Sequence, residues 1–258
     1  YYIILCYNVF VLTARKKGAD KVRKEPILMI KIDHLVKNYG ATCAVDDVSF
    51  EIHKGETFGL VGESGCGKSV TSMSIMQLLQ GPQGQIVSGS IRFNSHDYKR
   101  DAHGNMIPTG EVDQYGTPLY EMEDKVFDIA NMPIHEIHRI RGRQIAMIFQ
   151  EPMTSLNPVF TIGDQLDEVT FIHVPGATKE MAKARSMEML SLVGIAAPER
   201  VYKAFPHELS GGMRQRVMIS MALACNPRLI IADEPTTALD VTIQAQILEL
   251  LQDIKNKI

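Results

Sequence analysis

The stretch FGLVGESGCGKSVTSM, residues 58–73, joins two kinds of periodicity through a glycine-rich turn. Residues 58–61 form a short apolar run, which is typical of a buried strand, and the residues from 70 onward have the spacing of an amphipathic helix. Between them, residues 62–69 match the pattern GxxxxGK[ST]. A strand, a glycine loop and a helix in this order predict a loop that binds phosphate groups.

The chemistry of this loop comes mainly from its backbone. Glycines allow consecutive N–H groups to converge on a phosphate without a clash of Cβ atoms, and the helix that follows adds the positive end of its dipole. We expect Lys68 to reach the outer phosphates and the Ser69 hydroxyl to ligate Mg²⁺. The other residues expected to contact the nucleotide are Gly62, Glu63, Ser64, Gly65, Cys66 and Gly67. The alternative is a glycine-rich turn that binds nothing, but it leaves the flanking strand and helix unexplained.

Composition narrows the classes of protein. The 258 residues are 45% hydrophobic and 22% charged, enough to bury the core of one large domain or two smaller ones. A formal net charge of -3 gives no electrostatic reason to expect nucleic acid as the main partner. The four cysteines lie far apart without metal-ligand spacing, so a zinc site or a disulfide framework is not indicated and a reducing cytoplasm fits best.

The first 28 residues differ in character from the rest. Their apolar run of about a dozen residues is shorter than the roughly 20 that a transmembrane helix needs, and no basic leader precedes it. We expect residues 1–28 to be an extension of uncertain origin and the domain to span residues 29–258. The alternative is the end of a membrane span with a basic flank at residues 15–17.

Several further elements follow from periodicity. Alternating apolar and polar residues from 29 to 55 predict antiparallel strands of a small sheet. Residues 96–135 are polar and rich in Gly and Pro, which predicts a surface insertion without a chemical motif. Residues 144–149 and 229–232 are predicted to be buried strands. Helices are predicted within 160–200, where Thr178 caps one helix and Gly194 ends it, and from residues 213 and 241 onward.

Polar side chains follow the two predicted buried strands. Asp233 ends the second strand, where it could hold Mg²⁺ through water, and the adjacent Glu234 points to another face and could act on the attacking water. Gln150 ends the first strand and could share the metal and the water without adding charge. The alternatives are a solvated acidic turn before Pro235 and, for Gln150, an ordinary polar strand end.

A second glycine motif, ELSGGMRQR, occupies residues 208–216. Ser210, Gly211 and Gly212 precede a predicted helix, so their N–H groups could form a second anion site. One ATP needs only one phosphate loop. The second site is explained if it completes the nucleotide site of a neighbouring subunit in a head-to-tail dimer; the alternative is a plain Ser cap with a glycine turn.

These motifs, together with LIIADE and TALD, resemble in order and spacing those of ATP-binding cassette (ABC) ATPases, over roughly residues 29–258. The segments MIFQEPMTSLNPVFTIGDQ and LSGGMRQRVMISMALAC are most similar to the ATPase subunit of bacterial oligopeptide and dipeptide importers. The resemblance implies an α/β fold with a P-loop NTPase (RecA-like) core, a small antiparallel β-subdomain and an inserted α-helical subdomain at residues 152–212.

The resemblance also implies ligands and partners. ATP and Mg²⁺ would bind, with Tyr39 stacked on adenine and Asp240 at the dimer seam. The partners would be a second, homologous ATPase subunit in a heterodimer, two transmembrane permease subunits and, indirectly, an extracytoplasmic substrate-binding protein, with no nucleic acid. The location would be the cytoplasmic face of the cell membrane, where the subunit energises peptide uptake by ATP-driven closure of the dimer.

Three alternatives remain open at this point. The solute could be nickel or another small molecule. A cassette that acts on DNA or ribosomes would need a coiled-coil insertion, zinc cysteines or a second cassette, and the sequence shows none of these. The third is a chain that binds nucleotide but hydrolyses little of it. Cassette ATPases carry a histidine that contacts the γ-phosphate, beyond the helix that follows ALD, and here no histidine follows His207. We therefore expect residues 1–258 alone to bind ATP weakly and hydrolyse it poorly, and a chain extended past Ile258 to be active.

Overall fold

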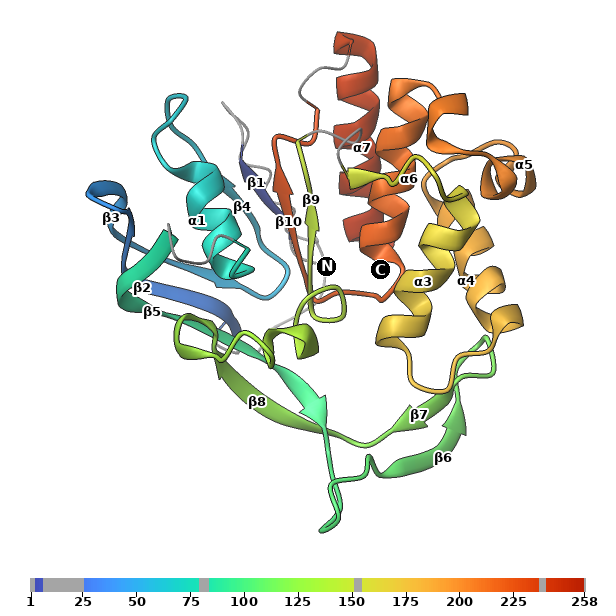
Figure 1. Ribbon diagram of the computed structural model, residues 1–258, viewed down its shortest axis with the longest axis horizontal. Coiled ribbons are helices and arrows are strands. Elements are labelled where there is room, and N and C mark those ends of the chain that lie inside the picture. Colours follow the sequence, from blue (N-terminus) through green and yellow to red (C-terminus); the bar gives the residue numbers. More distant parts are fainter. Residues whose placement is uncertain (1–2, 7–25, 79–83, 151–154, 237–239, 258) are drawn as a thin grey trace, which may run out of the picture. The chain divides into compact units, whose positions relative to one another are not determined.

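The computed structural model describes residues 3–6, 26–78, 84–150, 155–236 and 240–257 (Figure 1). The chain divides into two compact units. The sheet unit comprises Tyr2–Asp97 and Asp124–Arg141, and the helical unit comprises Tyr98–Glu123 and Gly142–Ile258. Most of the extension predicted at residues 1–28, and residues 152–154 at the start of the predicted helical subdomain, lie outside the described residues.

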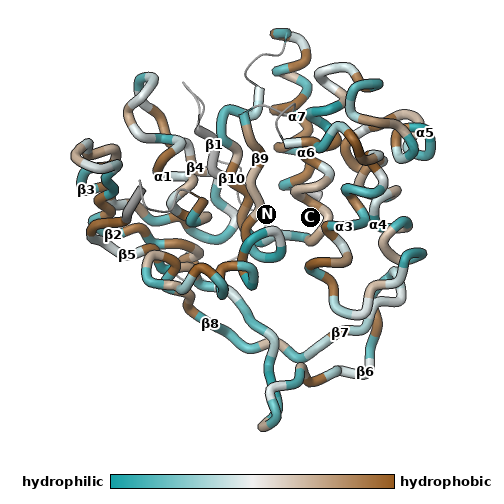
Figure 2. Tube along the Cα trace, viewed as in Figure 1, coloured by the Kyte–Doolittle hydropathy of each residue, from teal (hydrophilic) through white to brown (hydrophobic). Residues whose placement is uncertain are grey.

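The sheet unit is built on the small antiparallel sheet that the sequence predicts, in the order β3-β2-β5-β8. Ile32 of β2 pairs with Phe50 of β3 on one side and with Ile91 of β5 on the other. Because apolar residues alternate along these strands, one face is buried, and Figure 2 shows the apolar residues along β2. The strands are β2 (Leu28–Tyr39), β3 (Thr42–His53), β5 (Gly84–Tyr98) and β8 (Met122–Asp128).

A parallel strand pair and one helix complete the sheet unit. β4 (Thr57–Leu60) pairs in parallel with β1 (Ile3–Cys6), and α1 (Lys68–Ile75) follows β4 and contacts β3. The short 3-10 helices η1 (Ile129–Asn131) and η2 (Ile137–Arg139) lie in the segment between β8 and Arg141. From this segment, Arg141 donates through Nε to the carbonyl of Met76 and through its guanidinium to that of Gln77, both at 2.7 Å. These bonds satisfy carbonyls beyond the end of α1, which α1 itself leaves without partners.

The helical unit contains the two buried strands predicted from the sequence. β9 (Ile145–Ile148) and β10 (Leu229–Asp233) are parallel, with Ala146 opposite Ile230. Every residue of both strands is buried, as expected for strands covered on both faces, and α6 contacts β9. The predictions for residues 144–149 and 229–232 are confirmed.

Helices form the rest of this unit. Two of them begin at a threonine whose side chain caps the helix, and the sequence predicts one of these caps, Thr178. The Thr178 side chain accepts from Met181 N and Thr161 does the same from Asp164 N. Gly194, at φ +76, follows the end of the helix that Thr178 caps, as predicted. The helices are α3 (Ile162–His173), α4 (Lys179–Leu192), α5 (Pro198–Lys203), η3 (Pro206–Glu208), α6 (Gly211–Leu223) and α7 (Val241–Lys257).

A buried carboxylate joins three of these helices. Asp167 of α3 is 5% exposed and accepts hydrogen bonds from Ser186 Oγ of α4 at 2.7 Å and from the Tyr202 hydroxyl of α5 at 2.6 Å. Burial and the hydrogen bond to Asp167 raise the pKa of Tyr202. Because a buried carboxylate is costly without partners, the two hydroxyls fix the relative positions of α3, α4 and α5.

Part of the predicted insertion at residues 96–135 forms an ordered hairpin rather than irregular structure. We call residues 98–122 the arm. Within it, β6 (Pro108–Val112) and β7 (Pro118–Tyr120) pair antiparallel. The turn between them is closed by Asp113 Oδ1, which accepts from the backbone N–H groups of Tyr115 at 2.9 Å and Thr117 at 2.8 Å.

The arm contacts α4 through a group of polar and aromatic side chains. Arg185 donates to Asp113 Oδ2 at 2.6 Å, and its guanidinium lies 4.6 Å from the centroid of the Tyr115 ring. The Tyr115 hydroxyl hydrogen-bonds to Glu188, as does Gln114 Nε2 at 3.2 Å. The arm is therefore anchored to the helices by charge-assisted hydrogen bonds and a cation–π contact.

The Asp167 cluster predicts a stability effect. Tyr202→Phe removes one donor to a buried carboxylate, and we expect it to lower the free energy of unfolding by about 1–2 kcal/mol. Tyr120→Phe is the control, because the Tyr120 ring packs on Tyr98 but its hydroxyl makes no hydrogen bond to any residue that the structure describes. Urea unfolding of both variants compares them, and equal losses would show that Asp167 does not depend on Tyr202.

The arm predicts a dependence of stability on pH. Burial, and next the hydrogen bond to Glu188, raise the pKa of Tyr115 from an ordinary 10.0 to about 12. Below pH 10 the phenol is protonated in both states and its contribution is fully present; as the pH rises toward 12 the unfolded chain ionises first, so the contribution is lost. We expect the free energy of unfolding of Tyr115→Phe to fall less steeply over this range than that of the wild type. Parallel curves from urea titrations at stepped pH would contradict this.

Candidate functional site

The phosphate loop has the context that the sequence predicts, between strand β4 and helix α1. Gly65 and Gly67 have φ values of +80 and +92, and Gly67 is the left-handed N-cap of α1. A Cβ built on Gly67 would lie 2.4 Å from the carbonyl oxygen of Ala44. Both the backbone conformation and the space therefore require glycine at position 67.

The lysine of the loop lies over the loop's own carbonyls. Lys68 Nζ donates to the carbonyl oxygens of Gly62 and Glu63, both at 2.7 Å, and lies 3.9 Å from Cys66 Sγ. Residues 63–66 are exposed, while Lys68 and Ser69 are half-buried on the first turn of α1. The loop thus presents backbone groups, one ammonium and one hydroxyl on an accessible surface, which suits a polyanionic ligand.

Tyr39 lies in the same unit as this loop. It is the last residue of β2, paired with Thr42 and Gly84, and it is half-buried. Burial raises the pKa of its phenol. The ring is partly accessible, as stacking on a base requires.

In the helical unit, the structure brings together two of the predicted site residues. Gln150 Nε2 donates to Glu234 Oε2 at 3.1 Å, although the residues are 84 positions apart in the sequence. Asp233 is 3% exposed at the end of β10, whereas Glu234 is half-buried and has a φ of +45. The two adjacent carboxylates therefore have different environments, as the sequence predicts from their positions at a strand end.

The second glycine motif begins α6. The Ser210 side chain caps the helix and accepts from Met213 N at 3.4 Å, and Gly211 and Gly212 form the first turn. A Cβ on Gly212 would lie 3.2 Å from a methyl carbon of Ile243, so glycine allows the start of α7 to lie close. Asp240 is exposed directly before α7, and its carbonyl accepts from Gln244 N at 2.9 Å. The Ser cap foreseen as an alternative is present, and it leaves the N–H groups of the first turn directed out of the helix.

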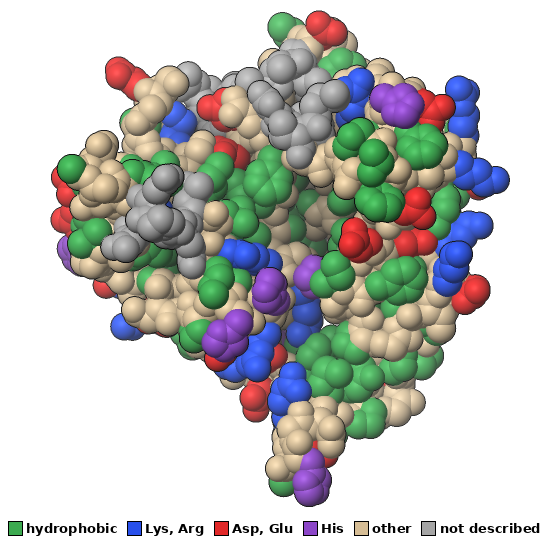
Figure 3. All heavy atoms as spheres, in the orientation of Figure 1, with side chains coloured by type: hydrophobic (Ala, Val, Ile, Leu, Met, Phe, Trp, Pro, Cys, Tyr) green, Lys and Arg blue, Asp and Glu red, His purple; other side chains and the backbone are tan. Residues whose placement is uncertain are grey.

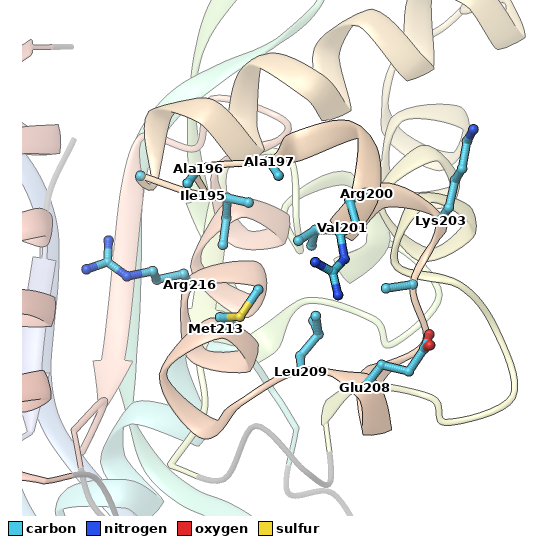
Figure 4. A pocket seen from close by; sticks show the side chains of 12 residues that line it. Ile195, Ala196, Ala197, Arg200, Val201, Lys203, Glu208, Leu209, Met213 and Arg216 are labelled. Atoms are coloured by element: carbon cyan, nitrogen blue, oxygen red, sulfur yellow. The ribbon is translucent and has the colours of Figure 1, made fainter.

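A cavity of about 540 Å³ lies between α5 and the start of α6 (Figure 4). Its apolar lining includes Ile195, Val201 and Leu209, with the side chain of Arg200 across it. No sequence pattern predicts this cavity, because its walls come from α5, from α6 and from the segments that flank α5. Of the described residues that line it, none belongs to the predicted site.

Hydrophobic side chains also gather on the surface of the helical unit, over the arm and the adjoining helices (Figure 3). Exposed large apolar residues there include Leu119 of β7 and Phe171 and Ile172 at the end of α3. Across the described ranges, every helix is too short or too polar to traverse a bilayer.

A strand that leads through a glycine loop into a helix, with a carboxylate at the end of a buried strand much later in the sequence, defines a phosphate-loop α/β protein. The profile of the ABC transporter family matches residues 45–237. The chain therefore belongs to the ABC transporter family, and the predicted fold class is confirmed.

Individual relatives agree with this assignment. The oligopeptide transport ATP-binding protein AppD of Bacillus subtilis is 50% identical over 83% of this chain and 56% of its own length. The dipeptide transport ATP-binding protein DppD of the same organism is 47% identical over 90% of this chain and 61% of its own length. The chain thus spans somewhat more than half the length of these curated relatives.

Solved structures show the same fold. The ATP-binding cassette MJ0796, determined as a dimer in a post-hydrolysis state bound to ADP and Pi, superposes with a TM-score of 0.66. It is 26% identical, and the match covers 89% of this chain and 84% of the cassette. A likeness of this extent covers both units of the chain.

The contrast between two loop glycines gives a prediction. Both Gly65 and Gly67 have positive φ, but a Cβ on Gly65 meets nothing within 4 Å. We expect Gly65→Ala to lower the free energy of unfolding by about 1–2 kcal/mol from backbone strain alone, and Gly67→Ala to lower it by clearly more because of the Ala44 carbonyl. Chemical denaturation of the two variants measures the difference, and equal losses would show that this carbonyl does not constrain the loop.

Proposed function

We propose that this chain is the ATP-hydrolysing subunit of a bacterial importer that takes up oligopeptides or dipeptides. The observation that carries the proposal is the hydrogen bond between Gln150 and Glu234 in a cassette fold whose phosphate loop is formed. A carboxylate held in this way at a strand end can act as a general base. The names of the relatives AppD and DppD support peptides as the transported solute.

The phosphate loop would bind the triphosphate of ATP. The backbone N–H groups of residues 62–69 would donate to phosphate oxygens, as their positive-φ glycines and the start of α1 suit. Lys68 would exchange its bonds to the Gly62 and Glu63 carbonyls for bonds to the outer phosphates. Tyr39 would stack on the adenine, which is worth about 1–3 kcal/mol for an aromatic face on a base.

The oxygen donors Ser69, Gln150 and Asp233 suit Mg²⁺, which prefers hydroxyl, amide and carboxylate oxygens. When bound, Mg²⁺ neutralises charge on the phosphates. Asp233, buried at the end of β10, would act on the metal through water. Glu234 would take a proton from the attacking water, and Gln150 orients that carboxylate through its amide.

The second glycine motif would act on a neighbouring subunit. Ser210, Gly211 and Gly212 would present the first N–H groups of α6 to the γ-phosphate of the partner's ATP, with the exposed Asp240 at the dimer seam. The dimeric state of the MJ0796 cassette supports this arrangement. We propose a homologous second subunit, hence a heterodimer, with each of two ATP molecules held between the subunits.

Transport would follow from closure of this dimer. This chain would lie at the cytoplasmic face of the membrane, where its helical subdomain, residues 152–212, would move two transmembrane permease subunits. An extracytoplasmic binding protein would deliver the solute to these subunits. ATP can bias the equilibrium between open and closed dimers only by binding the closed state more tightly. Contacts from both subunits to one ATP provide that difference.

The test of this function is Glu234→Gln in the complete protein with its partner subunit. The amide keeps the shape of the side chain but cannot accept the proton, so we expect phosphate release to fall by about 100-fold or more. ATP binding should persist, and gel filtration with ATP and Mg²⁺ should show a stable dimer. Glu199→Gln, at an exposed position on α5, is the matched control and should leave hydrolysis unchanged. Undiminished phosphate release by Glu234→Gln would exclude Glu234 as the base.

A further inference from the structure

A buried amide connects α6 to the turn that carries Glu234. Gln215, on the second turn of α6, is 1% exposed, and its Nε2 donates to the carbonyl oxygen of Pro235 at 2.5 Å. No sequence pattern indicates a role for this residue on its own. A buried amide without partners costs about 1–3 kcal/mol, so this hydrogen bond fixes where the side chain lies.

The turn that receives this bond has a strained backbone. Glu234 has a φ of +45, a left-handed conformation that costs a residue with a side chain roughly 1–2 kcal/mol. Such a conformation persists only where the surroundings hold it. Pro235 and Thr236, which follow, are both buried, and the bond from Gln215 is a polar contact between α6 and this turn.

The same helix begins with the second glycine motif. Ser210 caps α6, and Gln215 follows within the same rigid element. A small shift of the helix therefore moves both residues together. Because a hydrogen bond weakens steeply with distance and angle, a shift of Gln215 must be followed by the Pro235 carbonyl or must break the bond.

We propose that Gln215 is a positioning residue that couples the nucleotide of the partner subunit, bound at Ser210–Gly212, to the orientation of Glu234 in this chain. The inference rests on the function proposed above. Engagement of α6 by the partner's γ-phosphate sets the position of Gln215, which holds the left-handed turn and so the carboxylate hydrogen-bonded to Gln150. Hydrolysis at one site thereby depends on occupancy of the other.

The experiment replaces the amide while keeping its size. Gln215→Met and Gln215→Leu both remove the donor without adding charge, and Met keeps nearly the length of the glutamine side chain. In the complete protein with its partner subunit, we expect each variant to lower kcat for ATP by about tenfold and to bring the Hill coefficient for ATP close to 1, while the Kd for ATP changes by less than about twofold.

Gln165→Met is the matched control. Gln165 is also buried, at 6% exposure, and its Nε2 donates to the carbonyls of Asn157 and Phe160, away from the turn. Its replacement should cost similar stability but leave kcat and the Hill coefficient unchanged. An equal loss of kcat in Gln215→Met and Gln165→Met would show that Gln215 has only a packing role and would overturn the proposal.

Other outcomes separate this inference from the proposed function. If Glu234→Gln abolishes hydrolysis and both Gln215 variants retain kcat and cooperativity, the coupling is wrong and the function stands. If Glu234→Gln hydrolyses normally, the function itself fails. A wild-type Hill coefficient of 1 would also overturn the coupling.

Hydrogen exchange in the unaltered protein tests the same link without substitutions. On formation of the ATP-bound dimer, the amides of Glu234 and Thr236 should gain protection together with those at the start of α6. Protection of α6 without any change at these two amides would contradict the proposal.

Discussion

The carbonyl oxygen of Ala44 lies where a side chain on residue 67 would have to begin, and this steric constraint governs the site. At that position, between β4 and α1, both the positive φ and the nearby carbonyl require glycine. Once the loop is closed, Lys68 bonds to the carbonyls of Gly62 and Glu63, and Ser69 falls on the first turn of the helix. The phosphate loop is thus a consequence of packing against β3 as much as of its own sequence.

In the helical unit, side-chain hydrogen bonds, rather than a steric constraint, hold the elements in place. Asp167 joins three helices, Gln150 bonds to Glu234, and Gln215 bonds to the turn after β10. The bonds of the buried Asp167 and Gln215 side chains are costly to leave unmade, so each fixes an element in one position, whereas the bond from the exposed Gln150 is open to water. The same kind of bond that defines the packing of this unit thus also holds the Glu234 carboxylate and the turn that carries it.

The sequence was sufficient for the features that are local. GxxxxGK[ST] between a strand and a helix, the buried strands at β9 and β10, and the Thr178 cap are each encoded within a few neighbouring residues, and the structure confirms them. The bond from Arg185 to Asp113 and that from Gln215 to Pro235 join residues 72 and 20 positions apart. Such pairs carry no periodicity, so the anchoring of the arm and the link from α6 to Glu234 could not be predicted. The position of Glu234 at a strand end predicts it as a candidate site residue. Its left-handed backbone could not be predicted, since a glutamate gives no indication of positive φ.

We propose above that this chain hydrolyses ATP to drive uptake of peptides. The measurement that tests this most directly is phosphate release by the complete protein, assembled with its permease and binding protein in lipid vesicles, with and without an oligopeptide. The account predicts hydrolysis that requires Mg²⁺ and accelerates when the peptide is present. ATP binding without phosphate release, in the presence of peptide and Mg²⁺, would contradict it.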